Sequence, residues 1–386
     1  MPSVCFYFQI HQPVRLNKFT VFTQNAPYFD NQKNSMYFKR VSRKCYLPTN
    51  KTLLNVIDQL GKKFKVSFSL TGVFVEQCKN FAPEVLESFV ELSKTGCVEF
   101  LNETYYHSLA ALFSMEEFKN QIELHRNLIK DTFNQSPDVF RNTEAMYSNQ
   151  IAKLIEDMGY KGIITEGHEN ILGWRSPNYL YNPKDCGKMV ALLRNYKLSD
   201  DIGFRFSARW WEQYPLTADK YASWLSACQG DCINLFIDYE TFGEHQWEDT
   251  GIFEFLKVLP HEILKHRNLD FKTPSEVVKS YKPVGTIDVP YILSWADVQR
   301  DTSAWLENGM QKMAFEQMSK LKDMVKKDPE LLHVWRLLQT SDHFYYMCTK
   351  WFADGDVHKY FNPYNSPYDA FINYMNILQD IKRRLK

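Results

Sequence analysis

The sequence predicts an α/β fold in which parallel strands form a barrel and a helical domain follows. Three observations support this prediction. Strand-like and helix-like segments alternate through the first two thirds of the 386 residues, polar residues stand where several strands end, and after about residue 300 only helical segments remain. Such alternation favours a parallel sheet, and a chain of this length can close that sheet into a barrel around a large core.

About seven short apolar segments read as buried strands. Continuous apolar runs of this length are typical of strands that are covered on both faces. The predicted strands cover residues 4–11, 65–70, 98–101, 139–144, 161–165, 189–193 and 233–238.

Several segments between these strands have helical spacing. Ser114 precedes a long amphipathic run and Glu117 follows three residues later, which predicts a capping box at the helix start. Gly96 and Gly159 each follow a helical pattern, as glycine does at helix C-termini. The predicted helices cover residues 52–64, 83–95, 114–133, 149–158 and 221–228.

The last part of the chain is predicted to be helical. Three segments have helical patterns with no strand between them: 303–327, 330–339 and 368–385. The stretch before them carries Pro274, Pro283 and Pro290. We therefore expect a barrel over residues 1–265, a connection over 266–300 and a C-terminal helical domain over 301–386.

Composition argues against several classes of function. Lys and Arg together number 46, as do Asp and Glu, so the zero formal charge gives no electrostatic footprint for nucleic acid or an anionic membrane. No apolar run approaches membrane-spanning length, and the N-terminus lacks the basic region and cleavage site of a signal peptide. The eight cysteines form no CxxC motif, so we expect them to be reduced and mostly buried in a cytoplasmic protein.

Five polar residues stand at or just past the ends of predicted strands: His11, His107, Glu144, Glu166 and Asp238. Barrels of parallel strands carry their catalytic residues at this face. Two carboxylates at two strand ends are what acid/base catalysis on a glycosidic bond requires. Glu144 and Asp238 are the pair that best fits this chemistry.

Five stretches stand out in order along the chain. They are His11-Gln12-Pro13, residues 96–107, Arg141-Asn142-Thr143-Glu144, Asp238-Tyr239-Glu240-Thr241-Phe242-Gly243-Glu244-His245 and Gln339-Thr340-Ser341-Asp342-His343-Phe344. In this order they resemble the five signature regions of glycoside hydrolase family 57, specifically of its short α-amylase-like members, and the resemblance covers nearly the whole chain. The third stretch lacks the Trp-rich context of larger members, and the fourth has Asp-Tyr-Glu where others have Asp-Gly-Glu. These departures leave substrate choice within the family open.

The resemblance implies an incomplete (β/α)7 barrel with a helical domain that completes the active site. It implies a retaining glycosidase with Glu144 as nucleophile and Asp238 as acid/base, their carboxyl groups roughly 5–5.5 Å apart. The implied substrates are α-1,4-glucans, namely starch, glycogen and maltooligosaccharides, and α-amylase is the activity we favour. A 4-α-glucanotransferase or an α-glucan branching enzyme would form the same glycosyl-enzyme and differ only in the acceptor, so both stay open.

Further residues are expected to bind the sugar, with histidines and Asp342 contacting hydroxyls and tryptophans stacking on rings. The candidates are His11, Gln12, Glu99, His107, Trp210, Trp211, His245, Trp295, Asp342 and His343, with Trp247 as a further stacking surface. The expected partner is an α-glucan or maltooligosaccharide. We expect no metal or other cofactor, no nucleic acid and no membrane, and the oligomeric state is left open.

Each of these residues also has a purely structural interpretation. Glu144 and Asp238 fit ordinary ion pairs, His11 fits a core position, Asp342 fits a helix cap, and any single tryptophan fits the core. Two other functions stay as alternatives: a catalytically inactive glycan-binding protein, and a polysaccharide deacetylase, which needs an Asp and two His as metal ligands. His261-Glu262-Ile263-Leu264-Lys265-His266 is one residue too long for a zinc-protease motif, and no phosphate-binding glycine motif occurs.

Overall fold

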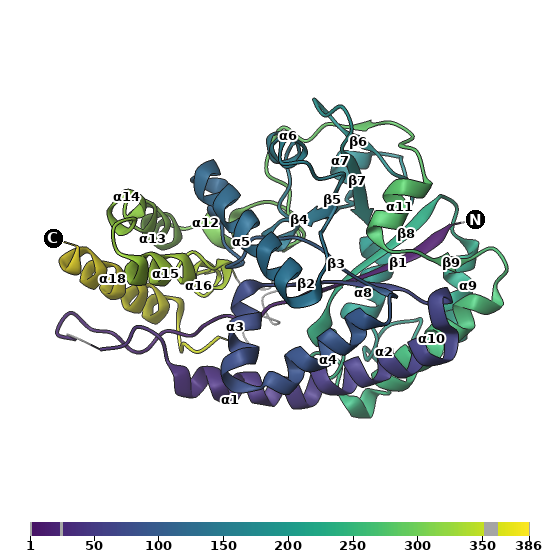
Figure 1. Ribbon diagram of the computed structural model, residues 1–386, viewed down its shortest axis with the longest axis horizontal. Helices are drawn as coiled ribbons and strands as arrows, with labels where there is room; N and C mark the ends of the chain where they lie inside the picture. Colours follow the sequence, from purple (N-terminus) through teal and green to yellow (C-terminus); the bar gives the residue numbers. More distant parts are fainter. Residues whose placement is uncertain (1, 24–25, 351–361, 386) are drawn as a thin grey trace.

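Seven parallel strands form the wall of the barrel in the computed structural model, which describes residues 2–23, 26–350 and 362–385 (Figure 1). One sheet has the order β3-β2-β1-β8 and another the order β4-β5-β7. All pairings within these sheets are parallel. The strands are β1 (Ser3–Ile10), β2 (Val66–Leu70), β3 (Val98–Phe100), β4 (Val139–Arg141), β5 (Gly162–Glu166), β7 (Val190–Arg194) and β8 (Cys232–Asp238).

Two junctions join the sheets into a ring. Beyond β3, Asn102 pairs with Phe140 of β4, and the backbone N–H of Arg141 donates to the carbonyl of Asn102 at 2.8 Å. Beyond β7, the backbone N–H of Asn195 donates to the carbonyl of Asn234 in β8 at 2.9 Å. The strands therefore close into a seven-stranded barrel, which confirms the predicted fold class.

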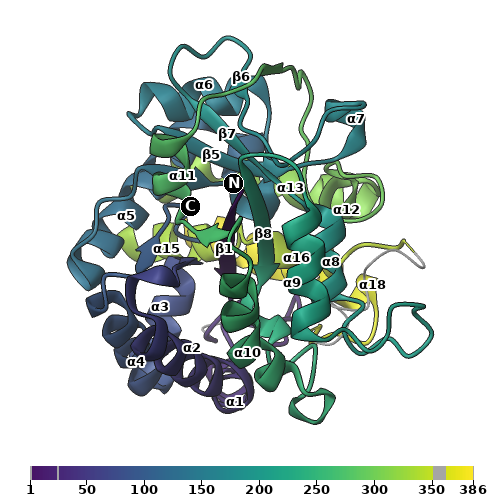
Figure 2. The ribbon, with the colours of Figure 1, turned by 90° about the vertical axis from the view of Figure 1, so that its right-hand side faces the viewer.

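Helices cover the outside of the barrel (Figure 2). Each helix predicted between the strands overlaps an observed one. The hydroxyl of Ser114 accepts from the backbone N–H of Glu117 at 3.3 Å, so the third of these helices starts where the sequence predicts. The five are α2 (Leu47–Leu60), α4 (Pro83–Lys94), α5 (Met115–Phe133), α6 (Asn149–Asp157) and α9 (Ala218–Ala227).

Other elements differ from the sequence prediction. α10 has Pro260 in its interior and α3 begins on Gly72, so neither shows an ordinary helical pattern. The single helix predicted over 303–327 is wrong, because Asn308 starts a new helix there by accepting from the N–H of Gln311 at 2.9 Å. The unpredicted α-helices before residue 300 are α1 (Asn31–Val41), α3 (Gly72–Phe81), α7 (Glu169–Leu172), α8 (Tyr196–Gly203), α10 (Ile252–Lys265) and α11 (Pro274–Ser280).

Side chains that point into the barrel change from apolar to polar toward the carboxyl ends of the strands. Tyr7, Val139, Ile164, Leu192 and Phe236 belong to one buried apolar cluster. Successive side chains on one face of a strand are two residues apart, so the next inward position on each of these strands follows directly. These positions are Gln9, Arg141, Glu166, Arg194 and Asp238, which we call the barrel floor.

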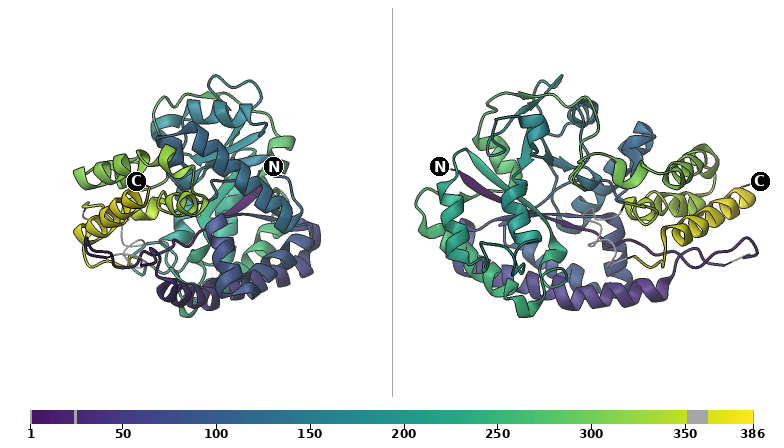
Figure 3. Two further views of the ribbon diagram at one scale, coloured as in Figure 1. Left: turned by 60° about the vertical axis from the view of Figure 1, so that its left-hand side comes forward. Right: turned by 180° about the vertical axis from the view of Figure 1, so that it is seen from behind.

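The helical domain lies beside the barrel and includes part of the N-terminal chain. The segment after β1 runs along α18 (Figures 1 and 3). The backbone N–H of Phe19 donates to the side chain of Asn373 at 2.5 Å, and the hydroxyl of Tyr28 donates to Asp380 at 2.7 Å. The segment after β1 thus packs with the C-terminal helices, and the domain boundaries at 265 and 300 stay a prediction. The C-terminal helices are α12 (Ser303–Leu306), α13 (Gly309–Ser319), α14 (Lys322–Val325), α15 (Pro329–Leu337), α16 (Ser341–Tyr345) and α18 (Pro367–Arg384).

Two further features concern the whole described chain. The eight cysteines are free thiols and five of them are buried, as the sequence predicts. Among the described residues, no helix combines the length and the apolar character needed to cross a membrane.

Candidate active site

A cavity of about 360 Å³ opens above the barrel floor at the carboxyl ends of the strands. It brings together nine of the twelve predicted site residues. These nine are His11, Gln12, His107, Glu144, Trp210, Asp238, His245, Trp295 and Asp342. The two carboxylates expected to carry the chemistry therefore line one cavity.

Glu144 lies just after β4 in a tight turn with left-handed backbone. Its φ is 54° and that of Ala145 is 52°, a conformation that residues with side chains rarely adopt outside functional sites. The side chain of Asn142 accepts from the N–H of Thr143 at 2.9 Å, and the Thr143 hydroxyl lies 2.6 Å from that of Thr104. The predicted strand therefore ends at residue 141, and a braced turn carries the carboxylate into the cavity.

Donors from three separate parts of the chain hold the Glu144 carboxylate. His107 Nε2 lies 3.2 Å from Oε1, and the hydroxyl of Ser341 donates to the same oxygen at 3.1 Å. The indole N–H of Trp295 donates to Oε2 at 2.8 Å. His107 follows β3, Trp295 lies in the predicted connection, and Ser341 starts α16. Such donors to a carboxylate that is only 8% exposed stabilise its ionised form.

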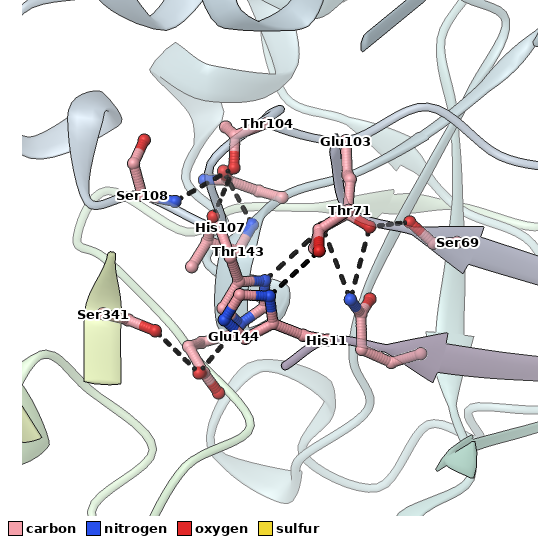
Figure 4. A network of polar contacts seen from close by, with 12 residues as sticks. His11, Ser69, Thr71, Glu103, Thr104, His107, Ser108, Thr143, Glu144 and Ser341 are labelled. Atoms are coloured by element: carbon pink, nitrogen blue, oxygen red, sulfur yellow. Dashed lines mark hydrogen bonds and ion pairs between the residues drawn. The ribbon is translucent and has the colours of Figure 1, made fainter. Parts of the chain in front are cut away.

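His107 lies between two carboxylates (Figure 4). Its Nδ1 is 3.4 Å from Glu103 and its Nε2 is 3.2 Å from Glu144. Burial lowers the pKa of this imidazole, but the hydrogen bonds to both carboxylates outweigh burial and raise the pKa to about 9. The ring is therefore a cation at neutral pH and donates to both carboxylates.

His11 stacks on His107, with ring centroids 4.2 Å apart and planes inclined by 17°. Its Nδ1 lies 3.0 Å from the hydroxyl of Thr71, and its Nε2 lies 3.2 Å from Asp342. Burial, and then the charge of His107, lowers the pKa of His11. The stacked pair therefore carries one positive charge at neutral pH.

The structure brings Glu103 into this network in place of Glu99. The buried carboxylate of Glu103 accepts from the hydroxyl of Ser69 and from the side-chain amide of Gln9 at 3.3 Å. Glu99 instead accepts from the backbone N–H of Ser275 at 3.0 Å and does not line the cavity. Glu99 therefore lies away from the cavity, toward the other end of the barrel.

Arginines surround the ring of Trp295. The guanidinium carbons of Arg141 and Arg194 lie 4.6 Å and 5.6 Å from the centroid of this ring. The side chain of Arg300 donates to the backbone carbonyl of Trp295. Glu166 is buried between two of them, 3.1 Å from Arg194 and 3.3 Å from Arg300. The ring that the sequence suggests as a sugar platform thus already contacts protein cations, and its N–H donates to Glu144.

Asp238 ends β8 opposite Gln9 of β1. Two residues later Glu240 lines the same cavity, and the hydroxyl of Tyr46 donates to its carboxyl group at 2.5 Å. Burial, and then the negative charge of Asp238, raises the pKa of Glu240 to about 8. Glu240 is therefore protonated at neutral pH, beside the carboxyl group expected to act as acid/base.

The remaining predicted aromatic and histidine side chains separate into two groups. Trp210 is 79% exposed and lines the cavity. Trp211 packs against Trp224, with ring centroids 6.1 Å apart, and His343 is buried against a ring of the helical domain. Trp247 is exposed but lies outside the cavity lining. Trp211 and His343 therefore pack within the fold and do not line the cavity.

The histidines of the zinc-protease-like stretch lie apart from the cavity. His261 and Glu262 belong to α10, and His266 follows the end of that helix. Within the described ranges, no group of three His, Cys, Asp or Glu side chains is arranged to hold a metal ion.

Solved structures share this fold over the full length of the chain. The 4-alpha-glucanotransferase from Thermococcus litoralis has a TM-score of 0.73 and 15% identity, covering 100% of this chain and 60% of that one. The GH57 branching enzyme from Thermococcus kodakaraensis has a TM-score of 0.70 and 14% identity, covering 100% of this chain and 90% of that one. At these identities the likeness shows the architecture.

Comparison with related sequences identifies the family. A Methanocaldococcus jannaschii protein, provisionally named an alpha-amylase, is 50% identical over 402 residues, covering 99% of this chain and 85% of the relative. The alpha-amylase of Pyrococcus furiosus is 24% identical over 263 residues, covering 66% of this chain and 38% of its own length. The sequence profile of glycosyl hydrolase family 57 matches residues 5–290, which contain the barrel and both carboxylates. The chain belongs to glycosyl hydrolase family 57.

Proposed function

We propose that the protein is a retaining α-glycosidase that acts on α-1,4-glucans through a glycosyl-enzyme, with α-amylase as its main activity. One observation carries the proposal: donors from three distant parts of the chain hold Glu144 in a cavity that Asp238 also lines. Family membership and the alpha-amylase names of two relatives support this substrate class.

Glu144 acts as the nucleophile. Its carboxylate oxygen forms a bond to the anomeric carbon while the bond from that carbon to the leaving sugar oxygen breaks. The hydrogen bonds from Ser341 and Trp295 fix the plane of the carboxylate before attack, which reduces the entropy lost on reaching the transition state. His107 balances the charge of the carboxylate in the free enzyme.

Asp238 acts as the acid/base. It gives its proton to the leaving oxygen in the first step and takes a proton from the incoming acceptor in the second, so the carboxyl group returns to its starting state. Burial is the main reason that the pKa of Glu240 is raised, so this neighbouring carboxyl group stays neutral at neutral pH and adds no negative charge beside the leaving oxygen.

The acceptor decides between hydrolysis and transfer. Phe204 and Trp210 line the cavity and are 50% and 79% exposed. Their segment is tied to the chain that follows β8, because the hydroxyl of Ser207 donates to Gln246 at 2.6 Å. This aromatic surface therefore lies on the Asp238 side, where the leaving sugar departs and an acceptor enters. Sugar rings can stack on such a surface, so a sugar could serve as acceptor in addition to water. The second candidate is therefore 4-α-glucanotransferase.

Products from maltoheptaose test the activity. Shorter sugars with new reducing ends would identify an α-amylase. A ladder of shorter and longer sugars with a constant number of reducing ends would identify a glucanotransferase, and new α-1,6 linkages a branching enzyme. Glu144→Gln should abolish turnover, whereas Glu99→Gln, the matched change outside the cavity, should leave it unchanged. Wild-type activity in Glu144→Gln would rule out the assigned nucleophile.

An aryl α-maltooligoside with an acidic phenol as leaving group separates the two roles. A good leaving group needs little protonation, so Asp238→Asn should retain more activity on this substrate than on maltoheptaose. Glu144→Gln should lose both activities. Equal losses on the two substrates in Asp238→Asn would contradict its role as the acid.

A further inference from the structure

A buried guanidinium lies below the cavity without a hydrogen-bond partner. The side chain of Arg141 is 0% exposed, and none of its three nitrogens finds an acceptor in the described part of the chain. Burying a charge without hydrogen bonds is unfavourable, so a residue of this kind at this position calls for another contact that compensates it.

An aromatic ring in contact with the guanidinium, and the charge of a nearby carboxylate, offset this cost. The guanidinium carbon lies 4.6 Å from the centroid of the Trp295 ring, which is within the range of a cation–π interaction. Burial raises the pKa of Glu103, but His107, together with weaker contributions that include the charge of Arg141, brings it below its usual value. Arg141 therefore contributes a positive charge to the same buried network as the nucleophile.

Trp295 links Arg141 to Glu144. Its indole N–H donates to Glu144 Oε2 at 2.8 Å, and its backbone N–H donates to the Glu144 carbonyl at 3.1 Å. A cation over the ring polarises the indole and strengthens the N–H as a donor. Trp295 belongs to a segment without regular secondary structure, whereas Arg141 is the last residue of strand β4. The contact therefore anchors the indole of Trp295 to a residue of the barrel wall.

We propose that Arg141 is a positioning residue for the nucleophile. It holds the indole of Trp295 in the orientation in which the N–H binds the carboxylate of Glu144. Arg141 is not among the residues that line the cavity, so it acts through the indole and not on the sugar. The inference rests on the proposed function, in which Glu144 is the nucleophile.

A double-mutant cycle tests this link. Arg141→Met should lower kcat on maltoheptaose about tenfold and change KM less than about twofold, because the residue does not touch the substrate. Trp295→Phe removes the N–H donor and should lower kcat at least as much. In the Trp295→Phe background, Arg141→Met should add little further loss. Arg141→Lys keeps the charge without the flat guanidinium and should give an intermediate kcat.

Two further readouts separate positioning from general damage. The acid limb of the kcat/KM profile should move up by about one pH unit in Arg141→Met, since the carboxylate loses support for its ionised form. The indole proton resonance that disappears in Trp295→Phe should move upfield in Arg141→Met, whether or not the protein turns over glucan. Arg126→Met is the matched control, because Arg126 lies 4.5 Å from the ring of Tyr160 outside the cavity. It should change neither readout.

The outcomes are distinguishable. Independent, additive losses of kcat, or an unmoved indole resonance in Arg141→Met, would overturn the role of Arg141. An inactive wild-type protein would count against the proposed function instead, and the indole resonance would still decide whether Arg141 orients Trp295.

Discussion

The rings of His11 and His107 stack at 4.2 Å, and only His107 is charged, although each ring contacts a carboxylate. The proton stays on His107 because that ring contacts two carboxylates, Glu103 and Glu144. His11 is adjacent to this cation and stays neutral. The cavity thus has a cationic ring beside Glu144 and a neutral ring next to that cation.

Replacing Glu103 should redistribute this charge. In Glu103→Gln the pKa of His107 should fall from about 9, because one of the two carboxylates that raise it is gone. The charge of Glu103 also raises the pKa of His11, so this pKa should fall as well. Titration of the imidazole resonances, assigned with His11→Gln and His107→Gln, measures both values. Glu99→Gln should move neither, and an unshifted His107 in Glu103→Gln would contradict the network.

The same histidine makes stability depend on pH. The pKa of His107 is about 9 in the folded protein against an ordinary value of 6.5, so the folded state binds this proton more tightly. The resulting stabilisation is fully present below about pH 6.5 and is lost as pH rises through about 9, a change on the order of 3 kcal/mol. Urea unfolding across this range should show a steeper fall in the free energy of unfolding for wild type than for His107→Gln. Parallel curves would contradict the shifted pKa.

Ser341→Ala should weaken catalysis from the helical domain. The substitution removes one of the donors to Glu144 Oε1, and a hydrogen bond to a charged group contributes enough that kcat should fall about tenfold. Steady-state kinetics on maltoheptaose measure the loss. Ser319→Ala is the matched control, because that hydroxyl donates to a carbonyl within α13 at 2.6 Å. Equal kinetics for the two variants would show that the helical domain does not support the nucleophile.

Trp210→Ala should affect the sugar and not the fold. The ring is 79% exposed at the cavity, so its loss should leave the unfolding midpoint unchanged and raise KM for maltoheptaose about threefold to tenfold. The ratio of transfer products to hydrolysis products should fall as well. Trp174→Ala, at 96% exposure and outside the cavity, is the control and should match wild type. An unchanged KM in Trp210→Ala would remove this ring from the binding surface.

The sequence could predict the barrel and the positions of Glu144 and Asp238 because both depend on local pattern. An apolar run predicts a buried strand, and a polar residue at its end predicts a position on the catalytic face of a barrel. The choice between Glu99 and Glu103 could not be made in this way. The two residues are four positions apart, so the alternation of side chains along β3 directs both toward the inside of the barrel. Only the observed bounds of β3 show that Glu99 lies within the strand and Glu103 lies past its carboxyl end.

The remaining parts of the site depend on tertiary contacts with no local signal. Trp295 and Ser341 reach Glu144 across 151 and 197 residues of sequence. An unpartnered buried guanidinium such as Arg141 is likewise invisible in a sequence, where arginine at a strand end usually predicts an exposed ion pair.

The segment after β1 can pack against α18 only after α18 itself has been synthesised. Phe19 leaves the ribosome early, yet its partner Asn373 is made 354 residues later. A nascent chain that has just passed Asp238 holds both carboxylates but lacks two of the groups that orient Glu144, Trp295 and Ser341. Glu144 therefore gains its full set of donors only after Ser341 is made, and a chain that stops soon after Asp238 would carry both carboxylates without two of the groups that hold Glu144.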